Sequence, residues 1–463
     1  MRGRSPRALV RSAYRALPEP LRKVAQTAYG AVPFPWNRGL QFGAHHQRFW
    51  RSQAWPRERL EALQLRELKR MAQHARQTVP AYRRIFAEIG FDPEAMRSLA
   101  DWTRLPLTTK AQIQDDPEAY VSRAIPPAER QRRTTSGSTG TPLVLYSTND
   151  THVAESAMMY RGWRWSGLTR DDRVVTCVGE LTGDELGPRH APYARYRNHI
   201  EISPHHLSEE AVRSYVDLIR EFAPAYLRTY PSIAQLFGKL MRDEGITPPP
   251  LRGIWTQSEA LLDCERRLVE EQWGTRVYDY YGMQEKCLAM SECEHGRMHV
   301  HCEFGHVELL PSEHPPYAHV VATGFYNPAM PLLRYQTRDL AIPDDRPCPC
   351  GRALPTVARI VGRLEDFLLA SDGSQVMEAD AAIAELTTIR ECQIIQESLS
   401  ACRVLVVPGP GYSAETEREL TARLRCQLGE EVSVTVERLT AIPRTATGKQ
   451  RFIVSKVKPG WAL

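Results

Sequence analysis

Residues 134–142 read Thr-Thr-Ser-Gly-Ser-Thr-Gly-Thr-Pro, and this stretch decides how the rest of the sequence is interpreted. Its hydroxyl side chains and two glycines describe a loop whose backbone N–H groups can approach and surround an oxyanion. The loop differs from the Walker phosphate-binding motif, because the Gly-Lys-Ser/Thr ending is absent and Leu143 follows the proline. The stretch therefore predicts phosphate binding, and the alternative is a flexible Gly/Ser linker.

Composition places the chain among ordinary globular proteins. Its 463 residues are too many for one hydrophobic core, so we expect a large domain and at least one smaller one. The net charge of +5 is small and no basic module stands out, which argues against nucleic-acid binding. The sequence shows neither an apolar run of roughly 20 residues nor the apolar centre of a signal peptide. Its ten irregularly spaced cysteines favour reduced thiols or metal ligands, and a cytoplasmic location is expected.

Residues 1–45 form a basic N-terminal arm ahead of the patterned part of the chain. The basic residues that begin it are Arg2, Arg4, Arg7, Arg11, Arg15, Arg22 and Lys23, against the single acid Glu19. A basic amphipathic segment of this kind can rest on an anionic membrane surface. Prolines at positions 6, 18 and 20 limit any helix to a short piece, so the pattern favours a solvated, partly ordered arm.

Hydrophobic periodicity predicts an alternation of helices and strands. A helix begins near residue 56 and ends at Val79-Pro80, and a short second helix covers residues 82–89. Further along, the predicted strands cover residues 173–178, 254–256, 276–278, 403–407 and 432–436, and the predicted helices cover 209–222, 232–241 and 414–428. We therefore predict an α/β fold: a large N-terminal domain with partly parallel sheets covered by helices, and a smaller α+β C-terminal domain.

Four further motifs carry residue types suited to a nucleotide. Residues 278–285 read Tyr-Asp-Tyr-Tyr-Gly-Met-Gln-Glu after a predicted strand, where a ring can stack on a purine and a carboxylate can coordinate Mg²⁺. Residues 334–339 (Arg-Tyr-Gln-Thr-Arg-Asp) and 362–366 (Gly-Arg-Leu-Glu-Asp) offer carboxylates for ribose hydroxyls and arginines for sugar or phosphate. Residues 443–451 (Pro-Arg-Thr-Ala-Thr-Gly-Lys-Gln-Arg) project one lysine from a glycine-supported turn. Each motif taken singly is also compatible with an ordinary surface or turn.

In this order, the five motifs resemble the signature set of the adenylate-forming acyl-CoA synthetase superfamily. The phenylacetate-CoA ligase-like branch is the nearest resemblance, because residues 74–82, 105–110 and 329–335 are similar to its sequences. The resemblance covers roughly residues 46–463. It implies a large adenylate-forming domain over residues 46–362, a small mobile C-terminal domain over residues 363–463, and an active site between the two.

The resemblance also implies roles for individual residues. The expected binding residues are Ser136, Gly137, Ser138, Thr139 and Gly140 for the β- and γ-phosphates of ATP, Ser258, Glu259, Tyr281 and Gly282 for the adenine, Asp339 and Arg363 for the ribose, and Glu285 for Mg²⁺. Lys449 is expected to be the catalytic cation and Asp366 the hinge. The superfamily usually has glycine before the ribose-binding aspartate, whereas this chain has Arg338. The sequence therefore does not decide the conformation of the turn before Asp339.

A two-step reaction follows from the resemblance. A small carboxylic acid attacks the α-phosphorus of MgATP to give acyl-AMP and pyrophosphate, and the thiol of CoA then displaces AMP. Lys449 and Mg²⁺ would stabilise the charge that develops in the first step. An aryl or arylacetic acid is the default substrate of the family. The acceptor can instead be a carrier-protein thiol or an amine, for example in polysaccharide or natural-product biosynthesis.

A non-catalytic nucleotide-binding scaffold is the competing function from a different class. A scaffold requires neither a catalytic lysine nor a metal-binding carboxylate, whereas this chain retains Lys449 and Glu285. The sequence therefore favours an enzyme.

The cysteines suggest a separate site. Cys348-Pro349-Cys350 is a tight C-x-C, and Cys293 and His299 lie upstream. Thiolates together with an imidazole make a tetrahedral Zn²⁺ site, and four protein ligands leave no open position, which is typical of structural zinc. Several members of the resembling branch carry such a metal, and these four residues match best. His295, His301 and Cys302 are competing ligands, and free buried thiols are the alternative.

Overall fold

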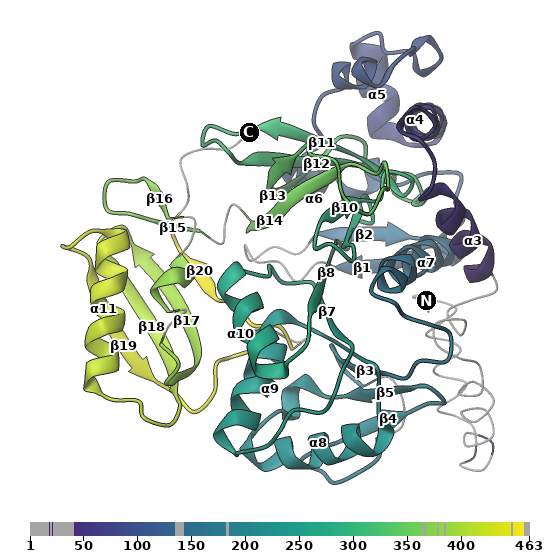
Figure 1. The fold of residues 1–463 in the computed structure, drawn as a ribbon. Coiled ribbons are helices and arrows are strands. Elements are labelled where there is room, and N and C mark those ends of the chain that lie inside the picture. Colours follow the sequence, from purple (N-terminus) through teal and green to yellow (C-terminus); the bar gives the residue numbers. More distant parts are fainter. Residues whose placement is uncertain are drawn as a thin grey trace. The chain divides into compact units, whose positions relative to one another are not determined.

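The computed structural model describes residues 18, 21, 41–134, 143–181, 185–363, 367–376, 379–383, 386–445 and 448–457. Most of the basic arm and the hydroxyl-rich loop at 135–142 therefore lie outside the described residues. The chain divides into two compact units, whose elements are labelled in Figure 1. Unit 1 contains residues 1–171, 196–198 and 278–360, and unit 2 contains residues 172–195, 199–277 and 361–463.

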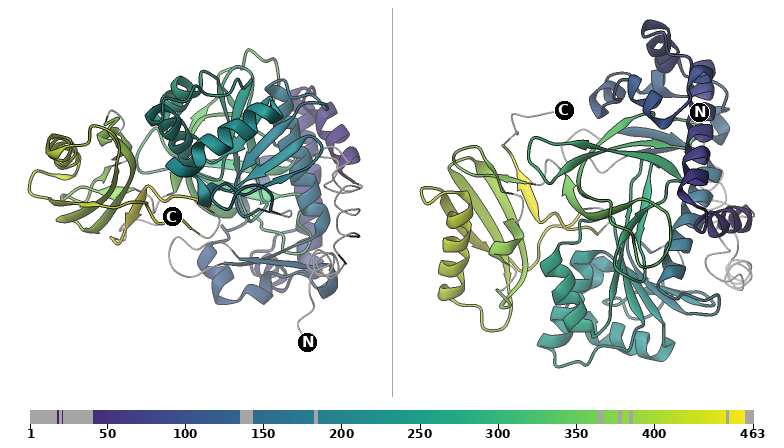
Figure 2. Two further views of the ribbon diagram at one scale, coloured as in Figure 1. Left: turned by 90° about the horizontal axis from the view of Figure 1, so that it is seen from below. Right: turned by 45° about the horizontal axis from the view of Figure 1, so that its top comes forward.

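Unit 1 begins with helices. They are α3 (Phe42–Ser52), α4 (Arg57–Thr78), α5 (Pro80–Glu88), α6 (Lys110–Asp115) and α7 (Asn149–Trp165). Both views of Figure 2 draw α3 against α7, and the ring of Phe42 meets that of Tyr160 edge-on with centroids 5.8 Å apart. The helix predicted from residue 56 is α4, and it ends at Val79 because Pro80 follows and begins α5.

The strands of unit 1 form a mainly antiparallel array. They are β8 (Val277–Gly282), β9 (Ala289–Glu292), β10 (Met298–Val300), β11 (Gly305–Pro311), β12 (Ala318–Gly324), β13 (Tyr335–Asp344) and β14 (Thr356–Arg363), together with the separate pair β1 (Gln131–Thr134) and β2 (Val144–Ser147). The array runs in the order β11-β12-β13-β14-β10-β9-β8. Strand β12 is buried along its whole length, which places the middle of the array in the core of the unit.

Unit 2 contains the parallel part of the fold. Its elements before residue 278 are β3 (Val174–Cys177), β4 (Tyr193–Arg195), β5 (His199–Ile202), α8 (Glu209–Phe222), β6 (Tyr226–Thr229), α9 (Pro231–Asp243), β7 (Gly253–Gln257) and α10 (Asp263–Trp273). Strand β3 pairs in parallel with β5 and β6, and β6 pairs in parallel with β7. The predicted helix over residues 209–222 is confirmed as α8, which Ser208 caps by accepting a hydrogen bond from the backbone of Ala211.

The C-terminal part of unit 2 is a small α+β sheet. Strands β17 (Ile389–Ser398), β18 (Ala401–Pro408), β19 (Ser433–Arg438) and β20 (Ile453–Ser455) follow the order β19-β18-β17-β20, and β15 (Leu368–Leu369) pairs with β16 (Gln375–Val376). Helix α11 (Ala414–Leu428) covers one face of the four-stranded sheet in Figure 1, through buried Leu420, Leu424 and Leu428. The predicted α+β character of this part is confirmed.

Polar contacts join the C-terminal sheet to α9 within unit 2. Lys239 is 7% exposed, and its Nζ donates hydrogen bonds to the backbone carbonyls of Ile389 (3.0 Å) and Arg390 (3.1 Å). The guanidinium of Arg390 pairs with Asp243 at 3.0 Å and also with Glu209. A buried ammonium in place of an apolar side chain makes this contact sensitive to pH.

We expect Lys239→Met to remove a pH-dependent part of the stability. Burial, followed by the charge of Arg242, lowers the pKa of Lys239 to about 8, whereas an unfolded lysine titrates near 10.4. The unfolded chain therefore binds more protons between these values, so the free energy of unfolding rises by about 3 kcal/mol as the pH increases from 8 to 10.5, and this gain is lost as the pH falls. Urea unfolding of both proteins across this range checks it; parallel curves would contradict it.

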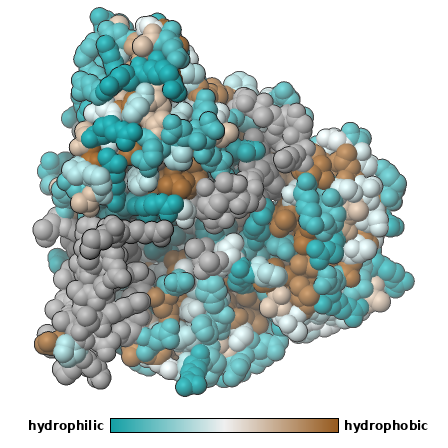
Figure 3. Space-filling model, turned by 180° about the vertical axis from the view of Figure 1, so that it is seen from behind, coloured by the Kyte–Doolittle hydropathy of each residue, from teal (hydrophilic) through white to brown (hydrophobic). Residues whose placement is uncertain are grey.

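Hydrophobic and hydrophilic residues are mixed on the face of the described residues that Figure 3 shows. In the view of Figure 3, brown hydrophobic areas are small and alternate with teal hydrophilic ones. Within the described part of the chain, every helix is too short or too polar to serve as a membrane-spanning segment.

Candidate nucleotide site and metal centre

Tyr281 and Asp339 meet in unit 1. Tyr281 lies near the end of β8 and Asp339 lies in β13, and the tyrosine hydroxyl donates a hydrogen bond of 2.5 Å to Asp339 Oδ2. Burial, and then the adjacent carboxylate, raises the pKa of Tyr281 well above its usual value. The hydroxyl therefore keeps its proton and acts as a donor. The next residue, Gly282, leaves room for the ring of Tyr280, because a Cβ at position 282 would lie 2.7 Å from that ring.

Arg338 occupies the backbone conformation that glycine would adopt most easily. Its φ is +67°, in the left-handed region, and the backbone N–H of the following Asp339 donates to Thr337 Oγ1 at 3.1 Å. The departure from the superfamily pattern therefore leaves a left-handed turn before Asp339, with the steric cost that a side chain adds there.

We expect Arg338→Gly to be more stable than Arg338→Val. Glycine adopts a positive φ without steric cost, whereas a β-branched residue there is strained, so the free energies of unfolding should differ by about 1–2 kcal/mol. Equilibrium unfolding in urea compares the two variants directly. Equal stabilities would mean that the backbone at this position is not left-handed.

Glu285 is the second predicted ligand-binding carboxylate of unit 1, after Asp339. Glu285 is 8% exposed and its Oε1 accepts a hydrogen bond of 3.2 Å from the hydroxyl of Tyr335. The following residue, Lys286, has a φ of +59°, and its Nζ lies 2.7 Å from the carboxylate of Glu155 in α7. This largely buried ion pair fixes the turn that carries Glu285.

Lys449 and Glu259 belong to unit 2, and a hydrogen bond joins Glu259 to the residue that follows Lys449. Glu259 Oε1 accepts from the backbone N–H of Gln450 at 3.0 Å, and its Oε2 accepts from the backbone N–H of Ser232 at 3.1 Å. Burial raises the pKa of Glu259, although these hydrogen bonds and the charge of Lys449 oppose the rise. Ser258, directly before it, is exposed and has a φ of +70°.

The turn that carries Lys449 is held by backbone hydrogen bonds. The N–H of Thr445 donates to the carbonyl of Lys449 at 2.9 Å, and the N–H of Gly448 donates to the carbonyl of Thr445 at 2.8 Å. Gly448 has a φ of +80°, and a Cβ there would lie 2.7 Å from Pro204. The turn therefore requires glycine, as the sequence predicts, and the Lys449 ammonium lies 5.8 Å from the centre of the Tyr230 ring.

The remaining predicted nucleotide residues fall into two groups. Arg363 is the exposed last residue of β14 and belongs to unit 2, whereas Asp339 belongs to unit 1. The predicted residues that lie outside the described ones are Ser136, Gly137, Ser138, Thr139, Gly140 and the hinge residue Asp366. Their roles stay predictions.

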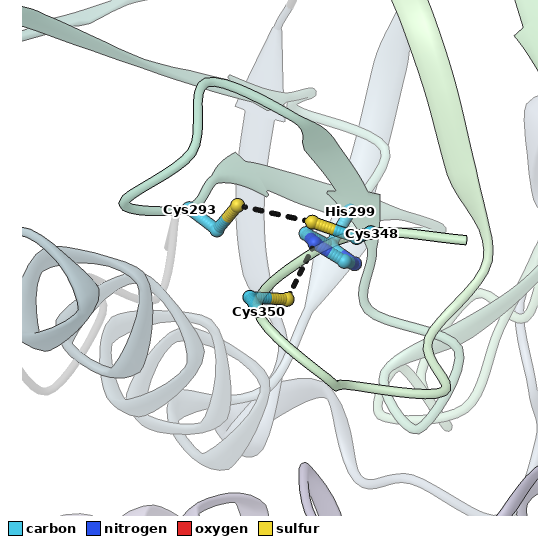
Figure 4. A group of neighbouring side chains, drawn as sticks. All are labelled: Cys293, His299, Cys348 and Cys350. Atoms are coloured by element: carbon cyan, nitrogen blue, oxygen red, sulfur yellow. Dashed lines mark hydrogen bonds between the residues drawn. The ribbon is translucent and has the colours of Figure 1, made fainter. Parts of the chain in front are cut away.

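Four potential metal ligands lie together in unit 1, as Figure 4 shows. The side-chain donor atoms of Cys293, His299, Cys348 and Cys350 all lie within 4.8 Å of one another. Cys293 Sγ is 3.6 Å from Cys348 Sγ, and Cys350 Sγ is 3.4 Å from His299 Nε2. Tetrahedral zinc with Zn–S bonds of about 2.3 Å requires sulfur atoms about 3.8 Å apart, so this donor set suits the ion.

The surroundings of the cluster favour metal binding. His299 Nδ1–H donates to the carbonyl of Leu354 at 3.4 Å, which leaves the Nε2 lone pair directed at the sulfurs. Burial lowers the pKa of His299 to about 4 and raises that of Cys348 to about 12, so the imidazole is neutral and the thiols need a cation to ionise.

The competing ligands are placed differently. His301 contacts Ser291 Oγ through Nε2 at 2.7 Å and Arg161 through Nδ1, and the backbone N–H of His295 donates to Cys293 Sγ at 3.4 Å. Within the described residues, the cluster of donor atoms does not include His295, His301 or Cys302.

Comparison with known proteins identifies the family. The sequence is 31% identical to the phenylacetate-coenzyme A ligase of Thermus thermophilus over 330 residues, which cover 68% of this chain and 72% of that protein. The chain belongs to the adenylate-forming ligase superfamily. This adenylate-forming ligase is thus homologous to AMP-forming acid–CoA ligases, as the sequence motifs predict.

A second relative of this adenylate-forming ligase is the protein CapK. Residues 368–456 match the CapK C-terminal domain. The protein CapK of Staphylococcus aureus is 24% identical over 373 residues, 78% of this chain and 82% of CapK. The C-terminal part of unit 2 is therefore similar to the CapK C-terminal domain.

Solved structures support the fold of this adenylate-forming ligase. A 2-hydroxyisobutyryl-CoA ligase in the postadenylation state aligns with a TM-score of 0.69 and 20% identity, and the alignment covers 88% of this chain and 91% of that one. The likeness confirms the predicted fold class: a mixed α/β fold with a partly parallel sheet and a small α+β C-terminal part.

Two supporting contacts were not foreseen from the sequence of this adenylate-forming ligase. The sequence motifs include Tyr335 but give it no role of its own, and Lys286 lies directly after the motif that ends at Glu285. Their partners, Glu285 and Glu155, depend on which strand and helix pack together, and no local spacing signals that. A tyrosine directly after a predicted loop of buried residues is the only hint at Tyr335.

Proposed function

We propose that this adenylate-forming ligase activates a small carboxylic acid with ATP and then forms an acyl thioester with CoA. The observation that supports it best is the anchored turn of Lys449, whose neighbour Gln450 is hydrogen-bonded to Glu259 in the same unit. A protein that only stores a nucleotide has no use for a lysine held this way beside a predicted adenine-pocket residue. Asp339 and Glu285 supply the acidic groups that ribose and a divalent cation require.

The proposed chemistry depends on electrostatic stabilisation. The substrate carboxylate attacks the α-phosphorus of ATP in line, pyrophosphate leaves, and negative charge develops on the oxygens of that centre. In this proposal Lys449 stabilises the developing charge, Asp339 accepts hydrogen bonds from the ribose hydroxyls, and Tyr281 lies against the adenine. Mg²⁺, held by Glu285, would neutralise phosphate charge.

The domain roles follow the same proposal. Residues 46–362 act as the large domain and residues 363–463 as a small domain that turns at Asp366 between the two half-reactions, while residues 1–45 form a basic arm. Ser136, Gly137, Ser138, Thr139 and Gly140 hold the β- and γ-phosphates, and Arg363 supports the ribose site. In the second half-reaction the thiol of CoA attacks the acyl-AMP and AMP leaves.

A structural zinc ion at Cys293, His299, Cys348 and Cys350 is part of the proposal. Four protein ligands leave no position for a substrate, so the ion would connect the loop after β9, strand β10 and the segment before β14 rather than take part in the reaction. The distances between the donor atoms support this assignment.

A different acceptor is the second candidate. In this alternative a carrier-protein thiol or an amine takes the place of CoA; residues 368–456 match the CapK C-terminal domain, a family whose name does not specify CoA. An aryl or arylacetic acid is the proposed substrate class in either case, on the basis of the phenylacetate-CoA ligase relatives.

Carboxylate-dependent exchange between ATP and labelled pyrophosphate tests the proposal. A panel of aryl, arylacetic and short hydroxy acids should give exchange with at least one acid, and adding CoA should then give a thioester detectable by mass spectrometry. Exchange without thioester formation would favour the second acceptor class. Nucleotide binding without exchange for any acid would favour the non-catalytic nucleotide-binding scaffold. A protein that binds no adenine nucleotide would refute both the ligase and the scaffold.

A further inference from the structure

Two tyrosines and two carboxylates of unit 1 are paired in a crossed arrangement. Tyr281 precedes Glu285 by four residues, and Tyr335 precedes Asp339 by four residues. The hydroxyl of each tyrosine donates to the carboxylate of the other segment: Tyr281 to Asp339 at 2.5 Å and Tyr335 to Glu285 at 3.2 Å. The segment of β8 and the segment of β13 therefore each position the acidic group of the other.

Both pairs are shielded from water. Tyr335, Asp339 and Glu285 are 2%, 6% and 8% exposed. Burial raises the pKa of both tyrosines well above the usual value, and the nearby carboxylates raise it further. Both hydroxyls therefore remain protonated donors at neutral pH.

A single hydroxyl donor restricts a carboxylate without saturating it. Each carboxylate has about four lone-pair directions, and the hydrogen bond from the tyrosine occupies one of them and limits rotation about the last side-chain bond. A carboxylate already held at the correct angle loses less entropy when it accepts a ligand. The geometry thus suits pre-orientation rather than occupation of the site.

The backbone around both pairs is held rigidly. The N–H of Asp339 donates to Thr337 Oγ1, and Thr337 in turn donates to the carbonyl of Val320 at 2.8 Å. At the start of β13, Arg334 forms a largely buried bidentate ion pair with Glu308 at 2.8–2.9 Å. The two tyrosine hydroxyls consequently act from fixed positions.

We propose that Tyr281 and Tyr335 are positioning residues with separate tasks: Tyr281 orients Asp339 for the ribose hydroxyls of ATP, and Tyr335 orients Glu285 for a divalent cation. This inference rests on the proposed function, since it assumes that Asp339 and Glu285 bind these two parts of MgATP. Neither hydroxyl touches the reacting atoms.

Two affinity ratios of the full-length protein separate the tasks. The first is the ratio of the Kd of 2′,3′-dideoxy-ATP to that of ATP, both with saturating Mg²⁺, and it reports on the ribose contact. The second is the ratio of the Kd of ATP in EDTA to that in Mg²⁺, and it reports on the cation. Isothermal titration calorimetry measures both. Stacking of the adenine cancels in each ratio.

We expect Tyr281→Phe to lower the first ratio about 10-fold and to leave the second unchanged. We expect Tyr335→Phe to lower the second ratio about 10-fold and to leave the first unchanged. The two variants are matched, because each removes one oxygen atom from a tyrosine whose hydroxyl donates to a carboxylate. If a phenylalanine variant does not fold, methionine at that position also lacks the hydroxyl and is flexible enough to fill the space, with the same expectation.

The outcomes are distinct. Equal losses in both ratios for both variants would show general structural damage and would overturn the inference, as would unchanged ratios in both. If the wild-type protein binds ATP and catalyses exchange while the variants behave like it, only the inference fails. If the wild-type protein binds no ATP, the proposed function fails first.

Discussion

Lys449→Ala should abolish adenylate formation and leave the conversion of supplied acyl-AMP into thioester nearly intact. The first half-reaction develops negative charge at the α-phosphorus, and loss of one pre-positioned charged donor at such a centre typically costs about 10²–10³-fold in rate. In the second half-reaction the phosphate leaves with AMP and the lysine is no longer required. ATP–pyrophosphate exchange measures the first step, and thioester release from synthetic acyl-AMP and CoA measures the second.

The Lys449→Ala substitution leaves the hydrogen bonds that hold the turn in place. The turn is held by the backbone bonds of Thr445 and Gly448 and by the bond from Gln450 N–H to Glu259, and none of these uses the Lys449 side chain. Lys456→Ala is a suitable control, because Lys456 lies seven residues further on, is exposed, and pairs with Glu397. It should keep both activities. Equal loss of both half-reactions in Lys449→Ala would contradict the assignment.

Loss of the Cys/His cluster should have the largest effect on stability. A structural zinc ion contributes about 10–16 kcal/mol of apparent binding energy in small domains, so removing one thiolate in Cys350→Ser should cost several kcal/mol. At about 2–4 °C per kcal/mol for a unit of this size, the thermal midpoint should fall by about 10 °C or more. Differential scanning fluorimetry and metal analysis of the same samples measure both quantities.

Purified wild-type protein should contain close to one equivalent of zinc. Cys426→Ser is the matched control, because Cys426 is exposed and lies on α11 in unit 2, whereas the cluster belongs to unit 1. It should retain the metal and the thermal midpoint. Wild-type protein with less than about half an equivalent of zinc would refute the metal centre, and the three cysteines would then be free thiols beside a neutral imidazole.

Regular patterns made the fold predictable. The alternation of buried and exposed residues gave the bounds of α8, and the proline after Val79 gave the end of α4. The C-x-C and the upstream cysteine and histidine could be recognised as two local pairs, and the family resemblance joined the two pairs into one predicted site. Each of these features depends on residues close together in the chain, where local physics dominates.

Features that depend on packing were not predictable. Arg338 stands where the motif leads one to expect glycine. Only the structure shows that its backbone is left-handed and that the turn is kept. The bonds from Tyr335 to Glu285 and from Lys286 to Glu155 join segments 50 and 131 residues apart. Which hydroxyl meets which carboxylate depends on strand order, and strand order is a property of the whole unit.

The contacts of Lys239 bear on how the protein can be dissected. A fragment that stopped at residue 362 would keep α9 but lose the carbonyls of Ile389 and Arg390, and the ammonium would be left against an apolar surface without acceptors. The break that looks natural along the chain is therefore a poor place to cut the gene.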